Sequence, residues 1–122
     1  MKKLYFLISL LLIMSACTKA PEVHVVRYEA DKATSALSIS WMDENGALQQ
    51  TTQDFNSTED SWSFTGTFEE GDIIYLSGTY SEEGGSQRLR ILIDGKAVRQ
   101  GENEYLPGEQ GRITLSGVVP IE

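Results

Sequence analysis

Few residues in this chain could carry out chemistry, and the scarcest of them limit its functions most. The 122 residues include one cysteine, Cys17, and one histidine, His24. One cysteine cannot form an internal disulfide bond, and the two residues together cannot supply the four ligands of a structural zinc site. His24 lies between Val23 and Val25 in a strand-like segment, where no Ser-His-Asp or Cys-His arrangement can be built. We therefore expect no catalytic residue, no metal or cofactor site and no enzymatic activity.

Carboxylates are abundant, with 18 Asp and Glu against 10 Lys and Arg for a formal net charge of −8. This acidic balance excludes the basic surface expected of a nucleic-acid-binding protein. The acidic residues gather in three turn-like segments: Asp43-Glu44-Asn45, Glu69-Glu70 with Asp72, and Glu82-Glu83. Ca²⁺ takes six to eight oxygen ligands, but none of these segments has the spacing of a calcium loop. Solvated turns are the favoured interpretation, with calcium binding and a glycosidase-type carboxylate pair as weaker alternatives.

Aromatic side chains could instead stack on sugar rings. The candidates are Trp41, Trp62, Tyr75, Tyr80 and Tyr105. Trp41 and Trp62 follow the same alternation as neighbouring apolar residues, so we expect both in the core. Tyr105 lies beside Pro107 and Gly108 and is the aromatic residue expected to be most exposed.

The N-terminus explains the position of the single cysteine. Lys2-Lys3 precedes an apolar run of 11 residues, from Leu4 to Met14, which suits a secretory signal and is short of the ~20 residues of a spanning helix. Only a thiol can accept a diacylglyceryl group as a thioether. The ending Ser15-Ala16-Cys17 resembles the bacterial lipoprotein signal, with Met14 where Leu is usual. The resemblance implies cleavage before Cys17 and acylation there, whereas the alternative is an ordinary signal peptide with an incidental cysteine.

Three segments follow from this interpretation. Residues 1–16 form the lipoprotein signal peptide, residues 17–22 a lipidated tether, and residues 23–122 a folded domain. The acyl chains would attach the protein to the membrane, at ~0.8 kcal/mol per buried CH₂. An acidic domain is repelled by an anionic membrane surface, so we expect it to face away.

The remainder of the chain has the period-two alternation of half-buried β-strands. The expected strands are 23–29, 37–42, 47–52, 62–68, 73–80, 88–93, 96–98 and 113–119, with 47–52 at a sheet edge and a weak helical turn near 30–36. Asp94-Gly95 predicts a two-residue hairpin, and Gly46 a turn with positive φ. The pattern predicts an all-β fold, an antiparallel immunoglobulin-like β-sandwich of about seven strands, with a small barrel as second choice.

Several of these segments also carry a family resemblance. They are Val26-Arg27-Tyr28-Glu29, the hairpin from Ser38 to Gly46, Trp62, Asp72 to Ser77, and the hairpin from Ile91 to Val98. Together they resemble the MmpS-type membrane-protein family and similar small bacterial lipoproteins. This sequence has Trp41 where a Tyr is usual and lacks the cysteine pair of the mycobacterial members. The resemblance implies a β-sandwich accessory domain at the cell envelope, associated in some members with export.

Two functions are compatible with these residues. The first is a non-enzymatic cell-envelope lipoprotein, expected at the outer membrane on its periplasmic or surface face. It would be held by the lipid at Cys17 and act as an accessory module for a protein partner such as a membrane transport system. The second is a carbohydrate- or small-ligand-binding lipoprotein, which two or more exposed aromatic residues on one face would favour. The sequence predicts no oligomeric state.

Overall fold

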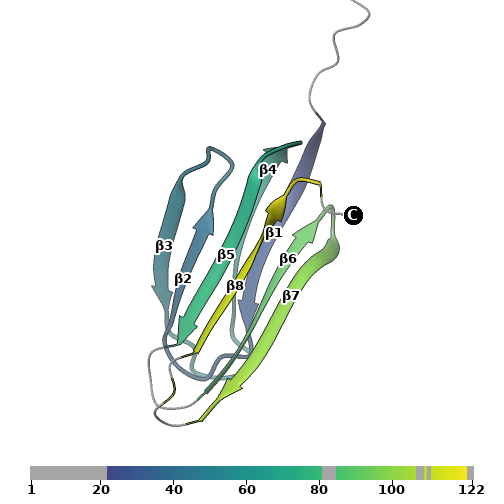
Figure 1. Cartoon of the computed structure of the whole chain (residues 1–122). Helices are drawn as coiled ribbons and strands as arrows, with labels where there is room; N and C mark the ends of the chain where they lie inside the picture. The colour runs from purple at the N-terminus through teal and green to yellow at the C-terminus, as the bar shows by residue number, and fades with distance from the viewer. Residues whose placement is uncertain (1–21, 81–84, 107–108, 110, 121–122) are drawn as a thin grey trace, which may run out of the picture.

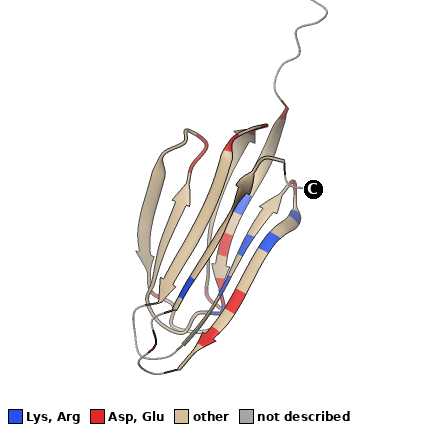
Figure 2. Cartoon of the chain, viewed as in Figure 1, with Lys and Arg blue, Asp and Glu red and all other residues tan. Residues whose placement is uncertain are grey.

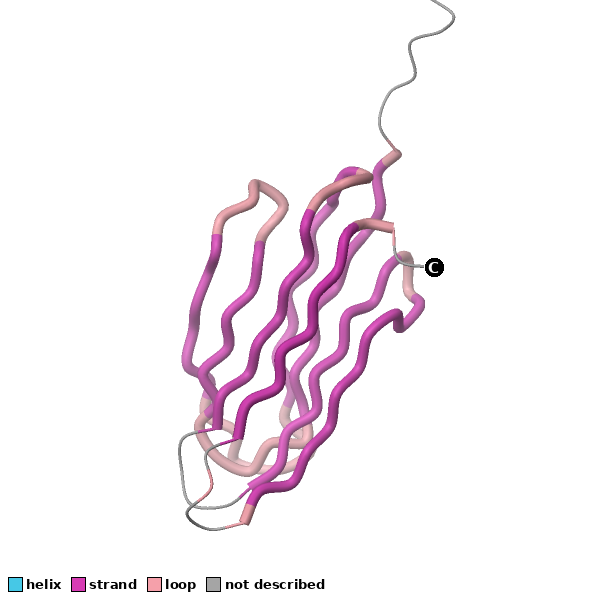
Figure 3. Tube along the Cα trace, in the orientation of Figure 1, coloured by secondary structure: helices cyan, strands magenta, loops and turns pink. Residues whose placement is uncertain are grey.

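The computed structural model describes residues 22–80, 85–106, 109 and 111–120. The described residues form eight β-strands and no helix (Figures 1 and 3). The strands are β1 (Val23–Asp31), β2 (Leu37–Met42), β3 (Leu48–Gln53), β4 (Ser61–Glu69), β5 (Ile73–Tyr80), β6 (Gly85–Ile93), β7 (Lys96–Tyr105) and β8 (Gly111–Val118). Cys17 and the segments 1–16 and 17–21 lie outside the described residues, as do Glu82 and Glu83.

The strands form two four-stranded sheets stacked face to face. Sheet A has the order β4-β1-β6-β7, and sheet B has the order β3-β2-β5-β8, with antiparallel pairing throughout. This confirms the predicted all-β sandwich, with eight strands where about seven were expected. Strand β3 lies at an edge, as predicted, because its residues beyond Leu48 are polar and none is buried.

Two local predictions were wrong. The segment expected to end near Val98 continues to Tyr105, because pairing with β6 satisfies its backbone even though its side chains lack an apolar alternation. The weak helical turn expected near 30–36 is not helical: β1 continues through Asp31, and Lys32 then adopts a positive φ of 56° that ends the strand.

The core is built from alternate residues of the inner faces. Residues at every second position are buried in the central strands, such as Val26 and Tyr28 in β1 and Leu89 and Ile91 in β6. This is the packing that a sandwich requires, since successive side chains point to opposite faces of a strand. Apolar side chains therefore fill the space between the sheets.

Tyr28 links the two sheets through a buried hydroxyl. The hydroxyl donates a hydrogen bond to the carbonyl of Met42 (2.7 Å), and it accepts a longer one from the N–H of Tyr75 (3.4 Å). Burial raises the pKa of this hydroxyl well above its ordinary value. The phenol therefore remains neutral and serves as a donor from sheet A to sheet B.

The Asp94-Gly95 hairpin matches its prediction in detail. Ile93 pairs with Lys96, which leaves two residues in the turn, and φ is +52° at Asp94 and +83° at Gly95. Positive φ at both central positions defines a type I′ turn, the type that fits the twist of a hairpin. A Cβ at Gly95 would meet no atom within 4 Å, so glycine is favoured there by backbone conformation alone.

The turns that join the strands gather at the two ends of the sandwich. We call the end where β1 begins the entry end; it comprises Glu22, the turns at residues 43–47, 70–72 and 94–95, and Val119. Backbone hydrogen bonds hold it together: the N–H of Glu70 donates to Glu22, the N–H of Gly71 to Val119, and the N–H of Asp94 to Val25. The start of β1 is therefore joined by backbone hydrogen bonds to the turns that follow β4 and β6.

Candidate functional site

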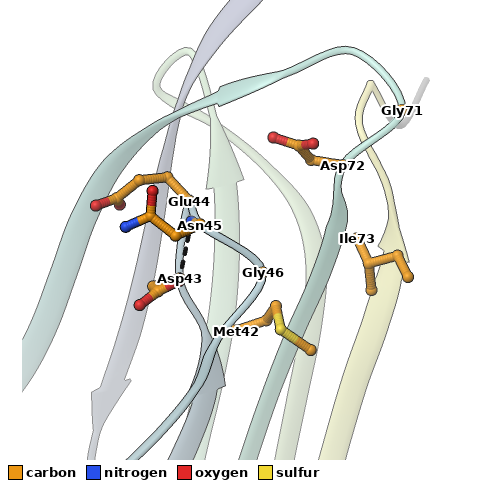
Figure 4. A pocket seen from close by; sticks show the side chains of 8 residues that line it. All are labelled: Met42, Asp43, Glu44, Asn45, Gly46, Gly71, Asp72 and Ile73. Carbon is orange, nitrogen blue, oxygen red and sulfur yellow. Dashed lines mark hydrogen bonds between the residues drawn. The ribbon is translucent and has the colours of Figure 1, made fainter.

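A shallow pocket at the entry end brings together two of the three acidic segments. One wall is the β2–β3 turn, with Asp43, Glu44 and Asn45, and the other is the β4–β5 turn, with Asp72 and the exposed Ile73 (Figure 4). The sheet order explains this meeting, because β2 and β5 are neighbours and Met42 ends β2 beside the start of β5.

Two carboxylates of this pocket, those of Asp43 and Asp72, accept hydrogen bonds from the protein itself. Asp43 accepts hydrogen bonds from the N–H groups of Asn45 and Ala47 and from the side-chain amide of Gln49, each at 2.9 Å. These donors lower the pKa of Asp43 below its ordinary value, with the Ala47 N–H as the largest cause. Asp72 likewise accepts from the N–H of Glu69 at 2.8 Å. These hydrogen bonds stabilise the two turns.

Glu44 reaches out of the pocket to the opposite sheet. Its carboxylate lies over Gly66 of β4, where a Cβ would collide with it. Gly66 is therefore a position of close approach rather than of unusual φ. Within the described ranges, no three Asp, Glu, His or Cys side chains converge to hold a metal ion.

His24 forms an ion pair at the same end. Its Nδ1 lies 2.7 Å from a carboxylate oxygen of Asp94, whose other oxygen accepts the N–H of Val25 at 2.9 Å. The hydrogen bond to Asp94 raises the pKa of His24 and, in return, lowers the pKa of Asp94. Glu22 lies 3.8 Å from Nε2 of His24. The histidine thus fastens the β6–β7 hairpin to β1, and its predicted place in a strand is confirmed.

The five aromatic candidates for sugar stacking are half-buried or, in the case of Tyr80, buried. Trp41 and Trp62 lie 4.8 Å apart between ring centroids, with Phe64 5.8 Å from Trp41. Both tryptophans face the core, as expected, but they are only half-buried. Tyr105, expected to be exposed, is half-buried and stacks on Tyr80, because β7 extends to include it. No aromatic residue in the described part of the chain is among the exposed large apolar residues.

Sequence reasoning missed a ladder of ion pairs on the outer face of sheet A. Glu29 contacts Arg27 (3.0 Å) and Arg90 (2.8 Å), and Asp31 accepts from Nε of Arg88 at 2.7 Å. The signal was present as charges at period two in β1 and β6, but only the pairing register shows that they meet. Figure 2 shows charged residues of both signs on the strands of sheet A, with further ones on β7.

The outer face of sheet B has the opposite character. Its outward residues in β2, β3, β5 and β8 are Ser, Thr, Gln, Tyr and apolar residues, with Arg112 as the charged one. Ile73 and Val118 pair directly on this face and are 58% and 53% exposed. Figure 2 shows sheet B almost free of charge along its strands. The sandwich therefore has one charged face and one neutral face.

Comparison with known proteins gives a likeness without a family. Neither a protein-family model nor a curated protein matches the chain. Among solved structures, a DUF4425 family protein from Bacteroides ovatus is similar, at 19% identity and a TM-score of 0.40, over 83% of this chain and 98% of the other. Within the described residues, no helix is long and apolar enough to span a membrane.

Proposed function

We propose that this chain is a non-enzymatic lipoprotein of the bacterial cell envelope, anchored in the outer membrane through Cys17. Its β-sandwich acts as an MmpS-like accessory module that binds a protein partner and assists a membrane transport system. The apolar run that ends at Ser15-Ala16-Cys17 supports the anchor. The segments that resemble the MmpS-type family include both hairpins of the sandwich, at β2–β3 and β6–β7.

The observation that carries the interaction role is the unequal distribution of charge between the two faces. Glu29 and Asp31 are paired with arginines on sheet A, whereas the outer face of sheet B offers hydroxyls, amides and the exposed pair Ile73 and Val118. Protein interfaces are depleted of charged residues at their centres. A neutral face on a chain of net charge −8 is therefore the surface best suited to a protein partner.

The tether sets the orientation of this face. Five residues, 18–22, separate Cys17 from β1, and at ~3.3–3.6 Å per residue they span at most about 18 Å. The entry end, with Glu22, Asp43 and Asp72, would face the lipid and be repelled by anionic headgroups. The strands would then run roughly perpendicular to the membrane, and the outer faces of both sheets would be accessible to a partner from the side.

Lipid labelling tests the anchor. In a Gram-negative host fed an alkyne fatty acid, the wild-type chain should be labelled and sediment with membranes, and Cys17→Ser should lose both properties. Thr18→Ala is the matched control and should behave as wild type. Cleavage at another site in wild-type material, without acyl groups, would overturn the anchor.

Site-specific photo-crosslinking tests the partner face. A photoreactive residue in place of Ser116, on the outer face of sheet B, should give an adduct of defined mass in intact cells. The same residue in place of Arg27, which is also exposed but lies on the outer face of sheet A, is the control and should not give that adduct. Equal adducts at both positions, or none at either, would contradict the assignment of the neutral face.

A further inference from the structure

The four edge strands of the sandwich are protected very differently. Native edge strands are usually blunted by charges, proline or a bulge, since their unpaired backbone groups can recruit another strand. Strand β7 carries Lys96, Arg99 and Glu102 and has a register shift, and β8 carries Arg112. Strand β4 carries Glu69 at its end.

Strand β3 has none of these protections. Its sequence, LQQTTQ, contains no charged residue and no proline, and its pairing with β2 is regular from Leu48 to Gln53. Figure 1 shows β3 at the outer border of sheet B. The strand is a regular, uncharged edge of the kind that accepts an additional strand.

The register identifies which backbone groups of β3 are free. The N–H of Asp43 donates to the carbonyl of Ala47 at 2.9 Å, so these two residues form a hydrogen-bonded pair. In an antiparallel ladder such pairs alternate with non-hydrogen-bonded ones. Counting along β3, the N–H and C=O of Gln49, Thr51 and Gln53 face β2, and those of Leu48, Gln50 and Thr52 point away from the sheet.

We propose that β3 pairs antiparallel with β3 of a second copy of this chain. The two-fold axis passes between Gln50 and the equivalent Gln50 of the second copy. This register places Gln50 opposite its equivalent and Leu48 opposite Thr52, so every free N–H and C=O of the edge finds a partner. Opposed residues then share a face, so the two copies of sheet B form one continuous sheet. Leu48, which is 62% exposed, is brought against the second copy.

The charge pattern favours a second copy as the occupant of this edge. Two chains of net charge −8 repel each other wherever their acidic residues meet. Along β3 there is no charge to repel, and the outward side-chain amide of Gln50 can hydrogen-bond to the amide of the Gln50 that lies opposite it in the second copy. The inference does not depend on acylation of Cys17.

Disulfide trapping in membranes of cells that express the full chain tests both pairing and register. In Gln50→Cys, the two Cα atoms of the opposed pair would lie ~5.5 Å apart, within the range that a disulfide bridges. Mild oxidation should shift this variant to twice the chain mass on a non-reducing gel. Wild type, treated alike, should stay at the chain mass and so controls for the thiol of Cys17.

A neighbouring position provides the control for register. The two copies of Thr52 would be offset by four residues, ~13 Å, so Thr52→Cys alone should stay at the chain mass. Thr52→Cys co-expressed with Leu48→Cys should cross-link. The proposal would be overturned by any of three results. These are no cross-link in Gln50→Cys, equal cross-linking of Thr52→Cys alone, and an adduct of any other mass.

A charge introduced at the two-fold axis gives an independent measurement. Gln50→Lys places two ammonium groups opposite each other, and in detergent extracts it should change the mass from dimer to monomer by light scattering. Ser116→Lys adds the same charge at the far edge of sheet B and should remain dimeric. A monomeric wild type, or a dimeric Gln50→Lys, would refute the pairing.

Discussion

Replacing Gly95 in the β6–β7 hairpin isolates the contribution of one backbone conformation. The residue has a φ of +83°, and a Cβ there would meet no atom within 4 Å. The Cβ added by Gly95→Val therefore meets no neighbouring atom, and the substitution removes no side-chain contact. The predicted effect comes only from holding a β-branched residue in the left-handed region.

The magnitude follows from the single residue involved. The left-handed conformation costs an L-residue about 1–2 kcal/mol, and we expect the free energy of unfolding to fall by that amount. For a domain of about 100 residues, each kcal/mol corresponds to a Tm change of about 4–8 °C. Urea unfolding of a chain that begins at Thr18, followed by the fluorescence of Trp41 and Trp62, measures the difference.

Asparagine provides the matched control, because it tolerates a positive φ better than other residues with a side chain. Gly95→Asn should therefore lose less stability than Gly95→Val, although both add a side chain at the same exposed position. Identical unfolding curves for wild type and Gly95→Val would refute the assignment of a type I′ turn. An equal loss in both variants would show that the added side chain, and not φ, is responsible.

Three other predictions concern single side chains. The pKa of His24, titrated by NMR, should lie above 6.5 and return toward that value in Asp94→Asn. The stabilisation from this pair should be complete between about pH 3.8 and 6.5. It should be lost as the pH rises through the raised pKa of His24, and lost again as the pH falls through the lowered pKa of Asp94. Trp62→Ala should cost less than about 3 kcal/mol in chemical unfolding, below the 3–5 kcal/mol of a fully buried aromatic residue, and a larger loss would place it deeper in the core. Tyr28→Phe should cost about 1–3 kcal/mol, because the part-buried carbonyl of Met42 loses its donor, and unchanged stability would show that another donor replaces it.

The sequence predicted the layers of the fold better than the lengths of its strands. Period-two alternation marks strands with one buried face, so β5 was located correctly from Ile74 and Leu76. Strand β7 contains the polar stretch from Arg99 to Glu104, where alternation is absent, and its pairing with β6 appears only in three dimensions. Edge strands are hard to find from apolar patterns, because few of their side chains are buried.

The candidate surfaces were only partly predictable for the same reason. The acidic turn at Asp43 was visible as composition, but its meeting with Asp72 depends on β2 and β5 being neighbours. The ion pair of Arg88 with Asp31 joins residues far apart in the chain, so no local pattern could assign it. Tyr105 was expected to be exposed because its loop was thought to begin earlier than it does.

The position of β1 determines how the domain responds to a mechanical load. β1 lies inside sheet A, between β4 and β6, and is hydrogen-bonded antiparallel to both along much of its length. A pull applied at Val23 along the axis of β1, in the direction from Asp31 toward Val23, loads the hydrogen bonds of both ladders in shear, so that many must break together. The pair of Asp31 with Arg88 adds resistance at the far end of the strand. Pulling β1 out of sheet A at Val23 therefore requires two ladders of hydrogen bonds to break, whereas an edge strand has only one.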